Sequence, residues 1–297
     1  MFLVNKINAI VKRSRWYNFN AFLGCRKFWQ LRKFDLEVVN LGSSASYYAF
    51  DYSAVAVKGY NFALPSQYLL ADYEILRNYF SFLKPGATVI LGTCLFPLDG
   101  YDVTYFDDRY YTLLTPPSIW HFSSKRQRLV LDIKNNPIKY YPIFALLSDI
   151  KHLFCKEKSL HYNKFQQDSK RWILNWANEF SIDDFNNPLS LRNSDLLIQA
   201  IDIVRKLKDF CDNKGFRLVM VQAPVSPDLK EWLSPSMRNN YIYALHNSET
   251  LKDIEYYDYL DDKDFINREL FSNAYILNNK GAKLFTHKVL KDIKLIK

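Results

Sequence analysis

The fold is decided by residues 38–44, whose sequence is VVNLGSS. The apolar run from Glu37 to Leu41 predicts a short strand that ends at Gly42. The small residues that follow predict a sharp turn, from which the hydroxyl of Ser44 would stand clear of the backbone at a sheet edge. Such a turn is also typical of a structural or phosphate-binding loop. The rest of the chain is needed to distinguish these interpretations from a turn that carries a nucleophile.

Strands and helices alternate through much of the chain. Further strands are predicted at residues 54–57, 87–91, 217–221 and 254–257, and helices at 66–83, 194–210 and 280–293. Ser66 and Ser194 are the expected N-caps, while Lys84-Pro85-Gly86 and Gly215 are the expected stops. This alternation predicts a flavodoxin-like three-layer α/β/α fold with a parallel sheet of about five strands. Binding residues then belong in the loops at the carboxyl ends of the strands.

Two segments stand outside this alternation. Residues 93–193 are rich in aromatic residues and proline, and they predict a long insertion after the third strand, with a helix at about 171–180. Residues 1–35 form a basic amphipathic N-terminal segment, which leaves 36–297 as the α/β domain. Aromatic residues make up 16% of the whole chain. A biased base composition of the gene explains most of them, and stacking surfaces for sugars or bases are the functional alternative.

The N-terminal segment holds most of the excess positive charge. Residues 1–35 contain eight lysines and arginines against Asp35 alone, a net charge of +7 in a chain of net charge +9. An amphipathic helix packed on the domain is the ordinary interpretation, and a segment lying on anionic lipid is the alternative. No nucleic-acid-binding motif accompanies the charge. No apolar run reaches the roughly 18 residues of a membrane span. We expect a cytoplasmic protein, with the inner face of the membrane as the alternative site.

Three blocks give the chain a family resemblance. They are GYNFALPSQ at residues 59–67, KPGATVI at 84–90 and FSNAYILNNKGA at 271–282. Together with the turn at Ser44, they resemble the SGNH (GDSL-like) hydrolases of the kind found in bacterial surface-polysaccharide loci. The resemblance extends over about two thirds of the chain and leaves out the insertion.

The resemblance implies a role for Ser44 and for the loops beside it. Ser44 would be the nucleophile, and its backbone N–H would contribute to the oxyanion hole. Asn61, after the second strand, would be a further oxyanion donor, although an asparagine there can equally serve only to shape the loop. The asparagine that the family often carries after the third strand is missing, and Thr93 is a partial substitute.

The catalytic dyad of the family is replaced. In the last block, Asn273 falls where the aspartate belongs and Ile276 where the histidine belongs. A serine hydroxyl needs an adjacent base, and loss of the base typically costs on the order of 10⁴–10⁶ in rate. Substitute bases are His121 in the insertion or the acidic cluster at 258–264, for which a solvated loop is the alternative. The other histidines are His152, His161, His246 and His287, and His287 lies well inside the last helix.

Two functions follow from the resemblance. The first is that of a carbohydrate O-acyl (O-acetyl) esterase or acyltransferase, which would act on an acylated saccharide. The second is that of a non-catalytic relative that binds a saccharide or a partner protein. No phosphate-binding glycine pattern and no metal-ligand spacing is present, so we predict neither a cofactor nor a metal.

Overall fold

The computed structural model describes residues 2–32, 34–101, 107–154 and 162–297. The chain divides into two compact units. The first combines Met1–Arg32 with Asp102–Lys158, and the second combines Lys33–Tyr101 with Ser159–Lys297. The insertion predicted at 93–193 is therefore divided. Its middle belongs with the N-terminal segment, and its end returns to the unit that contains the sheet.

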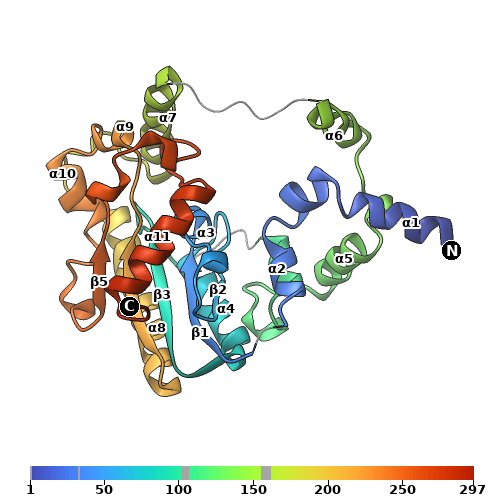
Figure 1. Cartoon of the computed structure of the whole chain (residues 1–297), viewed down its shortest axis with the longest axis horizontal. Helices are drawn as coiled ribbons and strands as arrows, with labels where there is room; N and C mark the ends of the chain where they lie inside the picture. The colour runs from blue at the N-terminus through green and yellow to red at the C-terminus, as the bar shows by residue number, and fades with distance from the viewer. Residues whose placement is uncertain (1, 33, 102–106, 155–161) are drawn as a thin grey trace. The chain divides into compact units, whose positions relative to one another are not determined.

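The second unit contains one parallel sheet of five strands (Figure 1). Along the chain they are β1 (Leu36–Gly42), β2 (Gly59–Asn61), β3 (Leu83–Thr93), β4 (Arg217–Gln222) and β5 (Glu255–Asp258). The spatial order is β2-β1-β3-β4-β5. This order and the helices on both faces confirm the predicted flavodoxin-like three-layer fold.

Helices cover both faces because the strands are apolar on both sides. On one face α11 (Asn279–Asp292) lies beside α3 (Ser44–Ala49), and its Phe285 and Val289 pack in the core cluster that includes Val38, Ile90 and Val219. On the other face α4 (Leu69–Tyr79) packs against α8 (Leu191–Lys214). The remaining helices of this unit are α7 (Tyr162–Phe180), α9 (Pro227–Lys230) and α10 (Pro235–Met237).

The predicted second strand at 54–57 is wrong by a few residues. Residues Tyr52–Ala54 form a 3₁₀ turn, and the strand that pairs with β1 is Gly59–Asn61. The ring of Tyr52 lies directly over Gly59, where an added Cβ would come within 2.1 Å of it. Val55 and Val57 are apolar because they pack on the core cluster beside α11, and not because they are paired in the sheet.

Some of the predicted helix signals also lie elsewhere. Ser190, and not Ser194, caps α8, since its hydroxyl accepts from the Asn193 N–H at 3.2 Å. Ser66 caps no helix, and α4 begins after Tyr68. Lys84-Pro85-Gly86 lies inside β3 and does not stop α4. Gly215 ends α8 in the left-handed conformation (φ +69°), as predicted. Asn278, just before the predicted last helix, caps α11.

The first unit is helical in its described residues. It contains α1 (Phe2–Val11), α2 (Cys25–Trp29), α5 (Ser124–Asn135) and α6 (Ile143–Phe154), joined by shorter turns. Its packing is largely aromatic. Tyr17 lies against Phe22 and Trp29, and the Trp29 indole N–H donates to Thr112 at 3.2 Å.

Candidate functional site

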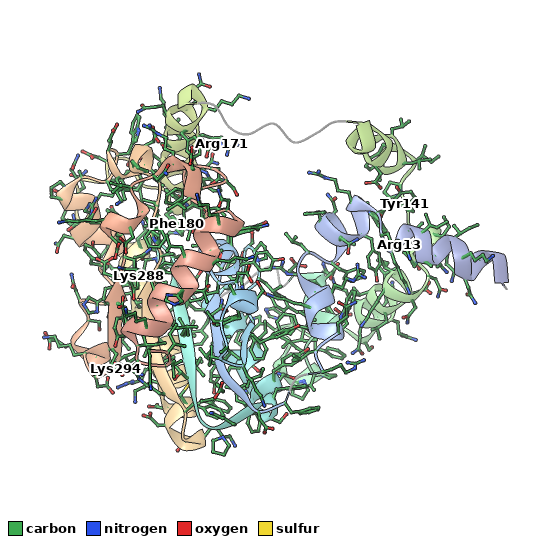
Figure 2. The ribbon with its side chains drawn as sticks, in the orientation of Figure 1. Arg13, Tyr141, Arg171, Phe180, Lys288 and Lys294 are labelled. Carbon is green, nitrogen blue, oxygen red and sulfur yellow. The ribbon has the colours of Figure 1, made fainter. Side chains whose placement is uncertain are left out.

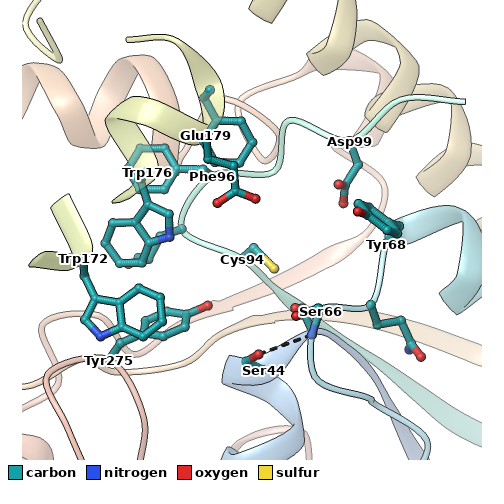
Figure 3. A pocket seen from close by; sticks show the side chains of 14 residues that line it. Ser44, Ser66, Tyr68, Cys94, Phe96, Asp99, Trp172, Trp176, Glu179 and Tyr275 are labelled. Atoms are coloured by element: carbon teal, nitrogen blue, oxygen red, sulfur yellow. Dashed lines mark hydrogen bonds between the residues drawn. The ribbon is translucent and has the colours of Figure 1, made fainter. Parts of the chain in front are cut away.

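A cavity of about 200 Å³ lies where a doubly wound sheet binds its ligands (Figure 3). β1 and β3 are neighbours although β2 separates them in sequence, so the chain leaves them toward opposite sides and opens a crevice at their carboxyl ends. The cavity is lined by the loops after β1, β2 and β3, by α7 and by the loop before α11. Its lining residues are Ser43, Ser44, Ser66, Gln67, Tyr68, Cys94, Leu95, Phe96, Asp99, Trp172, Trp176, Glu179, Phe180 and Tyr275.

Ser44 lies on the floor of this cavity, as the turn after β1 predicts. Gly42 has a φ of +120°, and a Cβ there would come within 2.5 Å of the Gly92 carbonyl oxygen, so only glycine fits the bend. The helix α3 starts at Ser44 itself. Among the described residues, the one hydrogen-bond partner of its hydroxyl is the backbone N–H of Ser66, at 3.4 Å (Figure 3).

A buried carboxylate is hydrogen-bonded to the backbone of the turn that precedes Ser44. Asp72 on α4 accepts from the Gly42 N–H at 2.6 Å and from the side-chain amide of Gln67. Burial raises the pKa of Asp72 to about 7, while these two donors act in the opposite direction. The residue fixes the backbone that presents Ser44, and the sequence analysis did not single it out.

Two further carboxylates face the cavity. Asp99, in the loop after β3, accepts from the N–H of Leu69 at the start of α4, and burial raises its pKa to about 6. Glu179 projects from α7 (Figure 3), and although much of the residue is exposed, partial burial of its carboxylate raises its pKa. Both groups therefore lie in surroundings that favour a ligand able to donate hydrogen bonds or a positive charge.

Aromatic rings form one wall of the cavity, and Glu179 lies on the same helix as three of them. Trp172, Trp176 and Phe180 lie four residues apart on α7, so they share one face of that helix. The rings of Trp172 and Trp176 are 5.6 Å apart at an interplanar angle of 30°. Tyr275 packs on both, at 5.2 and 5.3 Å. The result is an aromatic surface built of inclined rings, next to the carboxylate of Glu179 on the same helix.

Tyr275 also lies next to the turn. Its hydroxyl is buried near the backbone N–H of Ala45, the residue after Ser44, and burial keeps its pKa well above the ordinary value. In a serine hydrolase, an N–H beside the nucleophile is suited to stabilise the oxyanion. Here the phenol of Tyr275 lies near that N–H.

The other predicted site residues lie outside the cavity lining. Both amide hydrogens of Asn61 are used, by the carbonyls of Tyr47 and Phe50, at 2.9 and 3.0 Å. Its carbonyl oxygen accepts from Asn40 and from the Ala63 N–H, so Asn61 ties α3 to β2. The structure thus gives Asn61 the loop-shaping role that the sequence analysis held as the alternative.

The positions of the expected dyad have structural contacts as well. The side-chain oxygen of Asn273 accepts from the N–H groups of Tyr275 and Ile276, both at 2.9 Å, and so shapes the loop before α11. Ile276 is partly buried and packs against the apolar cluster that contains Trp176 and Tyr275. Neither residue faces Ser44 as a proton acceptor.

No histidine lines the cavity within the described residues. His246 stacks on Tyr256 at 3.9 Å, and His287 is exposed on α11. His121 belongs to the first unit. His161 lies outside the described residues, and so does the side chain of His152.

The acidic cluster at 258–264 forms local pairs and does not reach the cavity lining. Asp261 pairs with Arg238, and Asp262 and Asp264 pair with Lys288. The hydroxyl of Tyr243 donates to Asp258 at 2.9 Å. These contacts match the solvated loop that the sequence analysis gave as the alternative to a catalytic carboxylate.

Sequence reasoning missed Cys94, Asp99, Glu179 and Tyr275 as members of the site. Cys94 lies beside Ser43, and burial raises the pKa of its thiol to about 12, so it stays protonated at neutral pH. The four-residue spacing of Trp172, Trp176 and Phe180 was the visible signal, since it places three aromatic rings on one helix face. The chain matches no protein-family model and no curated protein.

Proposed function

We propose that this cavity binds a neutral or amino-bearing saccharide, and that Ser44 contacts this ligand without acting as a base-activated nucleophile. The observation that carries the proposal is an aromatic wall that shares one cavity with two carboxylates, Asp99 and Glu179, at the crevice between β1 and β3. Aromatic faces pack on the C–H surface of a sugar ring, and carboxylates accept hydrogen bonds from its hydroxyls. The chain would then be a degenerate relative of the SGNH hydrolases that it resembles.

The charge of the lining residues indicates which class of saccharide the cavity would bind. None of the 14 lining residues is Lys, Arg or His, while two are acidic. An anionic ligand, such as a uronic acid or a nucleotide sugar, would bring its charge toward carboxylates with no basic partner in the lining. A neutral sugar donates its hydroxyls to them, and the ammonium group of an amino sugar adds attraction to their charge and to the π-faces.

The absence of an imidazole in the lining argues against the enzymatic alternative. A serine hydroxyl is a weak nucleophile without an adjacent base. Within the described residues, the Ser44 hydroxyl is hydrogen-bonded to the Ser66 N–H and to neither Asp99 nor Glu179. No group of the cavity lining is therefore paired with Ser44 as a base.

Calorimetric titration of the full chain with three oligosaccharides tests the proposal. They are a neutral N-acetylhexosamine oligomer, its de-N-acetylated amino form and a uronic acid oligomer. We expect binding of the first two and none of the third. Trp172→Ala should weaken binding about tenfold, equivalent to about 1.4 kcal/mol, whereas Trp232→Ala outside the lining should not. Equal binding of the uronic acid oligomer, or an unchanged affinity in Trp172→Ala, would contradict the proposal.

The proposed role of Asp99 and Glu179 is tested with the positively charged, de-N-acetylated oligosaccharide. Its affinity should fall as the pH drops through about 6, because Asp99 becomes protonated and loses its attraction for an ammonium group. Glu179→Gln should weaken the amino form more than the neutral form. Glu249→Gln, which removes an exposed carboxylate paired with Lys252, is the matched control. A pH-independent affinity of the amino form would show that these groups do not face the ligand.

Acyl transfer at Ser44 is the second candidate, and the position of Ser44 at the first residue of α3 favours it. The serine oxygen would bond to the acyl carbon while the bond from that carbon to the sugar oxygen breaks, and the serine proton would pass through Asp99 or Glu179 to the departing sugar oxygen. Water or a second sugar hydroxyl would then take the acyl group from Ser44. Hydrolysis of p-nitrophenyl acetate and release of acetate from O-acetylated oligosaccharides test this candidate. Activity that Ser44→Ala abolishes and Ser43→Ala retains would establish it. Equal inactivity of the wild type and Ser44→Ala would leave binding alone.

A further inference from the structure

The net positive charge of the chain lies in the first unit. That unit holds 16 of the 40 lysines and arginines but only 6 of the 31 aspartates and glutamates, a net charge of +10. The second unit, which contains the sheet and the cavity, is left with a net charge of −1. A strong net positive charge on one unit bears on which partners it attracts and not on how it folds.

The same unit exposes large apolar side chains on α6. Ile143, Phe144 and Leu147 are 84%, 74% and 66% exposed, while Ala145 between them is buried. The helix is anchored on that buried side, because Asp149 accepts from the Arg15 N–H at 3.0 Å and from the Tyr141 hydroxyl at 2.5 Å. The apolar face is thus presented outward by a fixed helix.

α1 extends this surface. Its Ile10 is 67% exposed, and its Val4 is half exposed. A groove of about 630 Å³ lies between α1 and α6, with Ile7, Ile10, Ile138 and Leu146 in its lining. The lining also includes Arg13, Arg15 and Tyr141 (Arg13 and Tyr141 are labelled in Figure 2). Apolar side chains and basic groups therefore share one face of this unit.

We infer that the first unit docks on an anionic lipid surface, with α1 and α6 as its contact elements. The outward apolar side chains would enter the boundary between headgroups and acyl chains, and lysines and arginines would face the lipid phosphates. Within the described ranges, no helix is both long and apolar enough to cross a bilayer. The contact is therefore one of a helix lying in the interface. The sequence alone indicated lipid contact only for residues 1–35. The inference adds α6, which comes from the insertion, as a second contact element.

The net charge of the first unit favours an anionic lipid surface over other partners for the face formed by α1 and α6. A second copy would bring the same +10 toward its own kind, and like charge opposes such a pairing. The second unit of the same chain carries only −1 and offers little complementary charge. An anionic bilayer matches both the apolar side chains and the basic groups. The inference stands independently of the saccharide site.

Flotation of the full chain with phosphatidylcholine vesicles, with and without phosphatidylglycerol, tests the inference. We expect binding only to the anionic vesicles, and binding that weakens as salt is added. The double variant Ile143→Ser, Phe144→Ser should lose at least about tenfold in vesicle affinity. Its control is Leu191→Ser, Ile266→Ser, which removes apolar side chains that are 88% and 67% exposed in the second unit. Arg13→Gln should lose several-fold, and its control Lys283→Gln should not.

Circular dichroism and thermal melting of each variant confirm that it is folded. Because Ile143 and Phe144 are exposed, their replacement should leave both unchanged. Absent binding, equal binding to neutral and anionic vesicles, or full binding by the folded double variant would overturn the inference. A concentration-dependent dimer in light scattering that the double variant abolishes would also overturn it, since a second copy would then cover this face.

Discussion

Replacing Asp72 by Asn removes the buried acid that holds the turn beneath Ser44. The pKa of this acid is raised from 3.8 to about 7 in the folded protein, chiefly by burial. Between these two values the folded state binds more protons than the unfolded state. The stability that this group contributes is therefore complete below about pH 3.8, and it is lost as the pH rises to about 7.

The size of the effect follows from the shift of about three pKa units. Each unit is worth about 1.36 kcal/mol, so the wild type should lose at most about 4 kcal/mol across this interval through Asp72 alone. Asp72→Asn cannot ionise, so it should lack this component. Any change in its hydrogen bonds to Gly42 and Gln67 adds an offset that does not depend on pH.

Urea unfolding of both proteins at a series of pH values between 4 and 8 measures the effect. The wild type should become less stable relative to Asp72→Asn as the pH rises, by up to about 4 kcal/mol. Asp209→Asn, which removes an exposed carboxylate of α8, is the control for the loss of one negative charge. A difference between wild type and Asp72→Asn that stays constant across the series would refute the assigned burial of this acid.

Three further substitutions test the backbone and the core of the second unit. Gly42→Ala should destabilise the protein by about 3 kcal/mol or more, because it adds a Cβ at φ +120° and 2.5 Å from a backbone oxygen of β3; near-neutral melting would contradict the fitted bend. Ser190→Ala should cost about 1 kcal/mol in urea unfolding and Ser194→Ala much less, and the reverse order would return the cap of α8 to Ser194. Arg268→Met leaves the buried Asp228 without its cation and should cost about 2–3 kcal/mol, reduced from the usual range because the arginine is partly exposed; a thermal melt at the wild-type temperature would contradict it.

The sheet could be predicted from the sequence because its strands are buried on both faces. Val89 to Leu91 is a continuous apolar run, and Val38 to Leu41 is apolar except for the buried Asn40. Gly215 ends α8 in the left-handed conformation, which favours glycine. Local signals failed where a long-range contact decided the outcome. The run at 54–57 is apolar because it packs beneath α11, and Tyr52 over Gly59 shifts the paired residues toward the C-terminus.

The site could be predicted only in part for a related reason. Ser44 follows from its own neighbours, since a strand, a glycine and small residues define the turn. Its companions come from distant segments. Asp99 follows β3, Trp172 and Glu179 lie on α7 at the end of the insertion, and Tyr275 precedes α11. Only the folded chain brings these groups together. Only the folded chain shows that the side chains of Asn61 and Asn273 are hydrogen-bonded to backbone groups.

A crystal structure of the full chain with the tightest-binding oligosaccharide tests the central claim most directly. We predict a sugar ring packed on Trp172 and Trp176, with its hydroxyl or ammonium groups within hydrogen-bond distance of Asp99 or Glu179 and with no covalent bond to Ser44. A sugar bound elsewhere on the chain, or an acyl group attached to the Ser44 oxygen, would contradict it.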